Sequence, residues 1–352
     1  MSRSFAHISE GKMALKNKIR IKSKKRSSVS AVRPGSKFSD KTQKTNKIIA
    51  LVLIVVVFLV SAWEASQMIS QDVPKLKTQL ILKLNSDIKG AGAFSPWGAV
   101  AIGPDKIMVA DNQNNRLLLF NRKGDFIKSW GTSGKNADQF HEPSGMTVDD
   151  QGNAYVVDSW NSAIKGFNAD GKETAFIDLS NQGFFGPRGI GFDGNNFMVA
   201  DTGSHRIVLV GSKGNIVSSW GSVGTGEGQF KGPKAVVSDE KGHYYIADTD
   251  NNRIQCLDAN GKKIRYINLH SSADSVAVDQ QGRIYAGTIE NDGEIKVFNS
   301  NGGILGILVD GSGSGEFFKS VKFMTITPDD LLLLTDGDAV YLYQLPSFSN
   351  QK

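Results

Sequence analysis

Cysteine is almost absent from this sequence of 352 residues: Cys256 is its only one, so no disulfide can form within the chain. We interpret Cys256, between Gln255 and Leu257, as a small buried side chain on a strand. No Ser/His/Asp set and no strand-to-helix phosphate loop is visible, and the Gly-x-Gly-x-Gly of residues 224–228 lies in a predicted loop. These absences argue against a serine hydrolase and against a nucleotide-binding fold.

Acidic residues are scarce at the N-terminus, where residues 1–47 hold 14 Lys/Arg against 2 Asp/Glu, a net charge of +12. The remaining residues carry a net charge of −6, so the overall charge of +6 comes from a basic tail on a mildly acidic body. Because the tail is polar, Ser-rich and without a sustained apolar period, we expect it to be disordered. Its basic run, residues 22–26, suits contact with anionic lipid or with nucleic acid, and the segment that follows favours lipid.

An apolar run without charge occupies residues 48–63. A basic flank on one side of such a run places that flank in the cytoplasm. The run is shorter than the roughly 20 residues of a full crossing, but it has no polar face for a soluble helix, so we interpret it as a single-pass transmembrane signal anchor. A cleaved signal at residues 60–62 is the alternative. With a polar linker at 64–76, we expect a cell-membrane protein with a cytoplasmic N-terminus and an exported, periplasmic or cell-surface body.

A strand-turn-strand unit recurs along the body, and its clearest copy runs from Met198 to Val210 with Asp-Thr-Gly-Ser at the turn. The Asp, or its equivalent, falls at positions 111, 158, 201, 248, 287 and 336, with spacings of 47, 43, 47, 39 and 49 residues. Several short strands per unit at such a period are typical of a β-propeller. The sequence therefore predicts an all-β fold, a six-bladed β-propeller over residues 77–346, followed by a short tail at 347–352.

Each complete unit begins with a Pro-x-Gly segment and predicts four antiparallel strands. The sixth unit ends near Leu345 after only three strands, whereas residues 79–84 form a spare strand before the first unit. An open ring leaves strand edges unpaired. We therefore expect the N-terminal strand to pair into the last blade and close the ring.

Three motifs together resemble the NHL-repeat propeller family: Pro-x-Gly, Ala-Asp-Thr-Gly-x-x-Arg, and the Trp-Gly-x-x-Gly-x-Gly-x-Gly-Gln-Phe of residues 220–230. The resemblance covers residues 79–345. With the signal anchor, the chain looks like the membrane-anchored bacterial type and is similar to the extracytoplasmic sensor propellers of some bacterial receptor kinases. No kinase motif lies in residues 1–47.

Strand alternation puts the Pro-x-Gly segments, the Ala-Asp turns and the long inter-blade loops on one face, here called the top face, where we expect function to concentrate. The x residue of each Pro-x-Gly should line the mouth of the central channel. Those residues and their equivalents are Trp97, Ser144, Arg188, Lys234, Asp274 and Lys322. Unit two also departs from the repeat at Asp158 and Trp160, because Trp160 replaces a small turn residue and the Arg five residues after the Asp is missing. We predict that these eight residues form a binding surface for a protein, a peptide or an anionic ligand.

The Asp/Arg pairs at a spacing of five residues (Asp111/Arg116, Asp201/Arg206 and Asp248/Arg253) recur with the period. A feature repeated in several blades favours a structural role over a catalytic one. We expect the Asp to cap turn amides and the Arg to bridge neighbouring loops.

The resemblance extends to an enzyme branch, the peptidyl-amidoglycolate lyases, whose zinc-binding histidines stand at the x position as Pro-His-Gly. None of the six positions here is His, and the four histidines of the body stand elsewhere, at 141, 205, 243 and 270. Lactonase-type propellers need carboxylates and Asn around Ca²⁺, and only Asp274 is placed that way.

We therefore predict a membrane-tethered extracytoplasmic binding or scaffold module that uses no cofactor, no metal and no catalytic residue. The alternative is a propeller enzyme of the lyase or lactonase kind with a metal in the central channel. Nucleic acid is not expected as a partner, because the body is acidic and exported.

Overall fold

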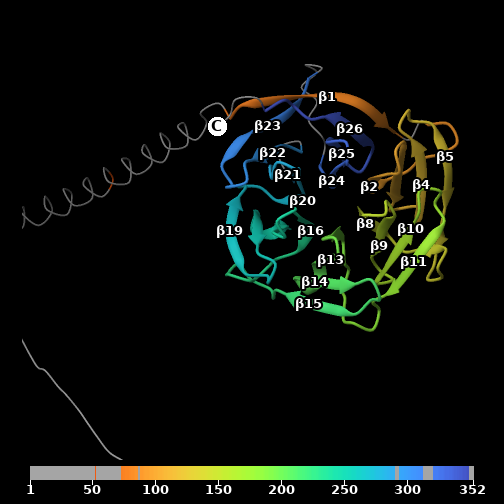
Figure 1. The fold of residues 1–352 in the computed structure, drawn as a ribbon, viewed down its shortest axis with the longest axis horizontal. Coiled ribbons are helices and arrows are strands. Elements are labelled where there is room, and N and C mark those ends of the chain that lie inside the picture. The colour runs from red at the N-terminus through yellow and green to blue at the C-terminus, as the bar shows by residue number, and fades with distance from the viewer. Residues whose placement is uncertain (1–51, 53–72, 86–87, 290–292, 312–319, 349–352) are drawn as a thin grey trace, which may run out of the picture. The chain divides into compact units, whose positions relative to one another are not determined.

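The computed structural model describes residues 52, 73–85, 88–289, 293–311 and 320–348. From Lys75 onward these residues form six antiparallel blades arranged around a central axis (Figure 1). In every blade the first strand of the repeat lies innermost, as the labels β8, β16, β20 and β24 near the centre of the view show. The all-β propeller predicted from the repeat is thereby confirmed.

From the inside outward, the strands of blade one are β2 (Pro96–Ile102), β3 (Lys106–Asp111), β4 (Arg116–Asn121) and β5 (Phe126–Trp130); those of blade two are β8 (Pro143–Val148), β9 (Ala154–Asp158), β10 (Ala163–Phe167) and β11 (Glu173–Asp178); those of blade three are β12 (Gly189–Phe192), β13 (Asn196–Asp201), β14 (Arg206–Gly211) and β15 (Ile216–Trp220). Blade four contains β16 (Pro233–Ser238), β17 (Tyr244–Asp248), β18 (Arg253–Leu257) and β19 (Lys263–Asn268); blade five contains β20 (Ala273–Val278), β21 (Ile284–Thr288), β22 (Ile295–Phe298) and β23 (Ile304–Asp310); blade six contains β24 (Phe323–Ile326), β25 (Leu331–Thr335), β26 (Val340–Gln344) and β1 (Lys75–Leu84). The short strands β6 (Thr132–Ser133) and β7 (Gln139–Phe140) pair within the loop between blades one and two, and two 3₁₀ turns, η1 (Thr202–Ser204) and η2 (Thr249–Asn251), follow β13 and β17.

The middle strands of each blade are continuous apolar runs because both of their faces are covered. In β3, the side chains from Ile107 to Ala110 are all fully buried, whereas the outer strand β5 is largely exposed. Burial is organised between blades: each of six apolar clusters contains residues of two adjacent blades, as where Met108 and Leu119 of blade one meet Phe140 and Val156. That cluster also includes Phe323 of blade six. The core is therefore a ring of inter-blade layers around the channel.

Glycine in Pro-x-Gly lets adjacent inner strands approach closely. A Cβ atom at Gly98 would lie 2.4 Å from the carbonyl oxygen of Ser144, and one at Gly189 would lie 2.3 Å from that of Lys234. Gly145 meets the Arg188 carbonyl in the same way and also donates its N–H to it at 2.8 Å. The x residue of one blade thus abuts the glycine of the blade before it, which fixes the spacing of the x residues around the mouth.

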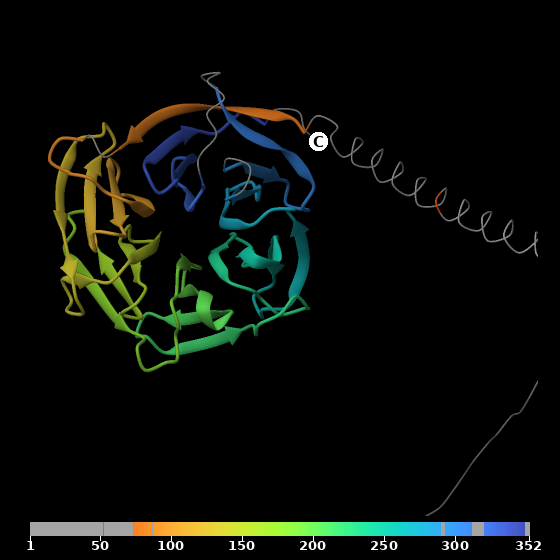
Figure 2. The same ribbon diagram turned by 180° about the vertical axis from the view of Figure 1, so that it is seen from behind.

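The N-terminal strand closes the ring, as expected from the sixth unit. Residues 79–84 of β1 pair antiparallel with β26, which completes blade six. The repeat does not predict the pairing of the first residues of this strand. Lys75 to Thr78 pair in parallel with residues 307–310 of β23 in blade five. Seen from behind, β1 arches over both blades (Figure 2). Strand β1 therefore pairs with strands of two adjacent blades.

The membrane expectations concern residues outside this part of the chain. The predicted tail (1–47), the predicted anchor (48–63) apart from Val52, and the predicted linker up to residue 72 lie outside the described residues. No helix with the length and apolarity needed to cross a membrane is found in the described part.

Candidate ligand-binding site

In blades one, four and five the innermost strand begins with a bulge at the x residue. In blade one, Pro96 pairs with Asp111 but the next pair is Gly98 with Ala110, so Trp97 is the extra residue. The same shift makes Lys234 the extra residue of blade four and Asp274 that of blade five. A bulge leaves one residue outside the ladder and re-aims its side chain.

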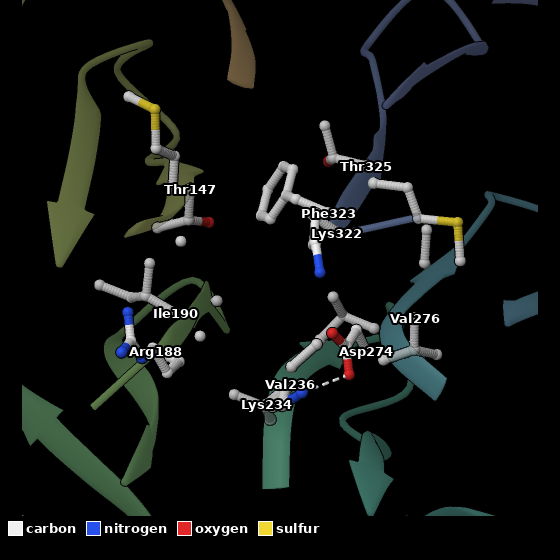
Figure 3. Close-up of a pocket in the computed structure, with 18 of the residues that line it drawn as sticks. Thr147, Arg188, Ile190, Lys234, Val236, Asp274, Val276, Lys322, Phe323 and Thr325 are labelled. Atoms are coloured by element: carbon white, nitrogen blue, oxygen red, sulfur yellow. Dashed lines mark hydrogen bonds and ion pairs between the residues drawn. The ribbon is translucent and has the colours of Figure 1, made fainter. Parts of the chain in front are cut away.

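A cavity of about 200 Å³ opens at the top face where these side chains converge. Five of the six predicted mouth residues line it, and they are here called the channel mouth: Trp97, Arg188, Lys234, Asp274 and Lys322. Apolar side chains of the inner strands also line the cavity, including Ile190, Val236, Val276 and Phe323 (Figure 3).

Positive charge exceeds negative charge at the channel mouth. The Nζ of Lys234 lies 2.6 Å from Oδ1 of Asp274, which is almost fully buried, and this pair appears as the dashed line in Figure 3. A guanidinium nitrogen of Arg188 lies 3.1 Å from a carboxylate oxygen of Glu142. Lys322 points into the cavity and has no ion pair among the described residues. Three cations therefore face two carboxylates.

Two of these cations lie close to the indole ring of Trp97. The guanidinium carbon of Arg188 lies 5.0 Å from the centre of the Trp97 ring, and Nζ of Lys322 lies 5.8 Å from it. Cations at such distances from an indole are attracted by the ring quadrupole. The side chains of blades one, three and six thus converge over the channel.

Ser144, the sixth predicted mouth residue, is fully buried and does not line the cavity. Its hydroxyl lies 2.8 Å from that of Ser159 and donates to the Arg188 carbonyl at 2.9 Å. The prediction that Ser144 faces a ligand is corrected: this small residue lets the chain at Arg188 pack across blade two.

Asp158 is also fully buried, and its surroundings give it a structural role. It accepts from the His141 backbone N–H at 2.7 Å and lies 3.0 Å from the Nζ of Lys165, whose side chain is fully buried as well. The prediction that Asp158 belongs to a binding surface is therefore corrected. The Arg five residues after this Asp is missing, as the sequence showed, and Lys165, seven residues after it, supplies the cation instead.

The other Asp/Arg pairs have the structural role expected of them. Asp201 accepts the Phe185 N–H at 2.8 Å and the Nε–H of Arg206 at 2.8 Å, and Arg206 then bonds to carbonyls of residues 182 and 183. Asp111 and Asp248 repeat this pattern with Arg116 and Arg253. The amide that each Asp caps belongs to the incoming inter-blade loop.

Trp160 lies on the top face but outside the cavity, with 46% of its surface exposed. It packs against two residues that the repeat did not single out. The Phe185 ring lies 6.3 Å away in an edge-to-face arrangement, and the His141 ring lies 6.4 Å away. We call this group, His141, Trp160 and Phe185, the aromatic shelf. The signal that could have found it is the Gly-Phe-Phe-Gly of residues 183–186, two adjacent aromatics in an inter-blade loop.

Glu142 is a second residue that the sequence reasoning missed. Its backbone is in the left-handed region (φ 58°), where the equivalent residues before Pro187 and Pro233 are Gly186 and Gly232 at 57° and 59°. A glutamate held in this region costs about 1 kcal/mol or more. In blade two this backbone cost falls on Glu142, the residue that forms an ion pair with Arg188.

Metal ligands do not converge in the described part of the chain, where no group of three or more His, Cys, Asp or Glu side chains is arranged to hold an ion. The histidines are dispersed: Nδ1 of His205 accepts the Gly232 N–H, and that of His243 lies 2.9 Å from Asp239.

Two family models match parts of the chain. One is described as a 6-bladed β-propeller and matches residues 95–198, and the other is the NHL repeat and matches residues 230–257. Among curated proteins, peptidyl-glycine alpha-amidating monooxygenase A of Xenopus laevis is 29% identical over an alignment of 208 residues that covers 53% of this chain and 21% of that protein. The chain thus spans about a fifth of the length of this relative.

Several solved structures have the same architecture. Streptogramin B lyase matches with a TM-score of 0.56 and 13% identity, over 75% of this chain and 97% of that one. Virginiamycin B lyase from Staphylococcus aureus matches with a TM-score of 0.54 and 12% identity, over 75% and 98%. A protein of unknown function from Bacteroides thetaiotaomicron matches with 0.57 and 13%, over 77% and 75%. At these identities the likeness shows the fold alone, and together with the family matches it shows a six-bladed β-propeller domain that contains an NHL repeat.

Proposed function

We propose that this protein is a membrane-tethered extracytoplasmic binding module whose propeller takes an anionic group of a protein or peptide ligand at the channel mouth. The observation that carries the proposal is the excess of cations there. Arg188, Lys234 and Lys322 line one cavity, where Asp274 is the one carboxylate among the described lining residues, and Glu142 pairs with Arg188.

The contacts of Lys322 support an anion site. Its ammonium lies near the Trp97 ring and has no carboxylate partner among the described residues, so a ligand anion can take that place. Hydrogen bonds between charged partners are shorter and stronger than neutral ones. The partly buried mouth also screens them less than open water does.

Membrane tethering is proposed on the sequence alone, from the apolar run at 48–63 and its basic flank. Protease treatment of spheroplasts, in which the outer envelope is opened and the cytoplasmic membrane is intact, followed by detection of an epitope fused after Lys352, tests the orientation. Loss of the epitope without lysis is expected; protection until lysis would refute an exported propeller.

Binding is tested by titrating the full-length chain with a labelled, end-capped Gly-Asp-Gly-Gly peptide and its Gly-Asn-Gly-Gly counterpart. The acidic peptide is expected to bind measurably more tightly. Lys322→Gln should weaken it about ten-fold, while Lys213→Gln, which removes an exposed lysine from the opposite face, should change nothing. Equal behaviour of the acidic and neutral peptides would refute an anion site.

An enzyme with a metal in the channel is the second candidate, and it is favoured by the names of the amidating monooxygenase and the lyases to which the chain is similar. Elemental analysis of the purified chain, with a chelator melt beside it, separates the two. Stoichiometric zinc or calcium whose removal lowers Tm would favour the enzyme, and a metal-free, chelator-insensitive chain would favour the binding module.

A further inference from the structure

The aromatic shelf is an exposed apolar surface that is held in place from below. Trp160 and Phe185 are 46% and 61% exposed, although their rings pack edge to face. The Phe185 N–H bonds to Asp201, its carbonyl accepts the Gly203 N–H at 2.9 Å, and its ring lies where a Cβ at Gly203 would come within 2.2 Å. The backbone N–H of Trp160 donates a hydrogen bond to the backbone carbonyl of His141.

Rigid exposed aromatic rings are suited to binding, because little side-chain entropy is lost when a partner covers them. Trp is also the residue type most enriched, with Tyr and Arg, at the centres of protein interfaces. The shelf therefore offers a preformed surface for one bulky apolar side chain.

The shelf is continuous with the channel mouth. Phe185 and Arg188 lie on the same loop three residues apart, so their Cα atoms are separated by at most about 11 Å. His141 of the shelf is followed by Glu142, whose carboxylate binds Arg188. Arg188 then lies against Trp97 at the mouth.

We infer that the partner is an extended peptide segment of a protein that carries a carboxylate and, two to four residues away, a bulky apolar side chain. The carboxylate binds between Arg188 and Lys322, and the apolar side chain packs on the aromatic shelf. The spacing follows from the rise of about 3.3 Å per residue of an extended chain. This inference rests on the proposed anion site and adds the kind of partner that the site selects.

Three end-capped, labelled peptides test it against the full-length chain by fluorescence polarisation: acidic only (Gly-Asp-Gly-Gly-Gly-Gly), apolar only (Gly-Asn-Gly-Gly-Leu-Gly) and combined (Gly-Asp-Gly-Gly-Leu-Gly). The combined peptide is expected to bind about ten-fold more tightly than the acidic one. Binding of the acidic peptide with no gain from leucine would overturn the inference and leave the anion site standing. No binding of the acidic or the combined peptide would overturn both, and equal binding of the apolar and combined peptides would overturn the coupling of shelf to mouth.

Variants assign the gain to the shelf. Trp160→Ala and, independently, Phe185→Ser should each remove the gain from leucine while leaving the affinity for the acidic peptide unchanged. Ile127→Ala removes a similarly exposed apolar side chain from the outer strand of blade one and should have no effect. Equal losses for the acidic and combined peptides in both shelf variants, or no loss in either, would refute a role for the shelf.

Discussion

The carboxylate of Glu142 lies 3.1 Å from the guanidinium of Arg188, and the backbone that places it there has a φ of 58°. Blades three and four have glycine at the same position. Blade two therefore keeps a backbone cost in order to hold a charged side chain beside the channel mouth.

Glu142→Gly should raise both stability and anion affinity. Relief of the left-handed strain should add about 1 kcal/mol to the free energy of unfolding, because glycine adopts this φ without penalty. Arg188 remains against Trp97 but loses its carboxylate, so the Asp peptide should bind a few-fold more tightly. Urea melts and peptide titration measure the two effects.

Glu142→Gln separates the two contributions. It keeps the strained backbone and removes only the charge, so it should raise affinity without the gain in stability. A weaker affinity in both variants would instead make Glu142 a residue that positions Arg188.

The fully buried pair Lys165 and Asp158 predicts a large loss on removing one partner. Lys165→Met should destabilise the chain by about 3 kcal/mol, because it leaves the Asp158 carboxylate buried without a cation. The double variant Lys165→Met with Asp158→Asn should recover part of that loss. Lys172→Met removes an exposed lysine from the turn between β10 and β11 of the same blade, and it is the control in the same urea melts.

The periodic part of the molecule could be predicted from the sequence, because it depends on contacts that every blade repeats. The Ala-Asp turns, the Pro-x-Gly segments and the missing sixth-blade strand led to the propeller and its closure. The same logic brought Trp97, Arg188, Lys234, Asp274 and Lys322 to one cavity.

The features that could not be predicted depend on contacts between blades, and these contacts do not recur with the sequence repeat. Ser144 is buried because the chain at Arg188 packs over it. Lys165 reaches Asp158 from a different position of the repeat, and Phe185 belongs to an inter-blade loop. The parallel pairing of Lys75 to Thr78 involves a segment with a single apolar residue, Leu76.

Closure by the N-terminal strand predicts a difference between two leucines of β1. Leu84 is fully buried in the cluster that joins blades six and one, whereas Leu80 is 38% exposed. Leu84→Ala should cost about 2–5 kcal/mol, the range for buried leucines, and Leu80→Ala less than about 1 kcal/mol. Equal Tm values for the two variants would contradict the conclusion that β1 stabilises the closed ring through the burial of Leu84.

A second contact across the closure, between Arg122 of blade one and Asp329 of blade six, predicts a pH dependence. Two guanidinium nitrogens of Arg122 bond to the two carboxylate oxygens of Asp329, one of them at 2.9 Å. These bonds lower the pKa of Asp329 to about 2, against an ordinary value near 3.8. The contribution is therefore fully present above about pH 4 and is lost as the pH falls through about 2.

Because the Asp329 side chain is half exposed, screening keeps that contribution below about 1 kcal/mol. Asp329→Asn should thus be slightly less stable than the natural chain at pH 6, and the difference should shrink as urea melts are taken from pH 4 toward pH 2. Asp138→Asn, which neutralises an exposed loop carboxylate, should show no such trend. A difference between the natural chain and Asp329→Asn that stays constant down to pH 2 would mean that the pair does not hold blades one and six together through charge.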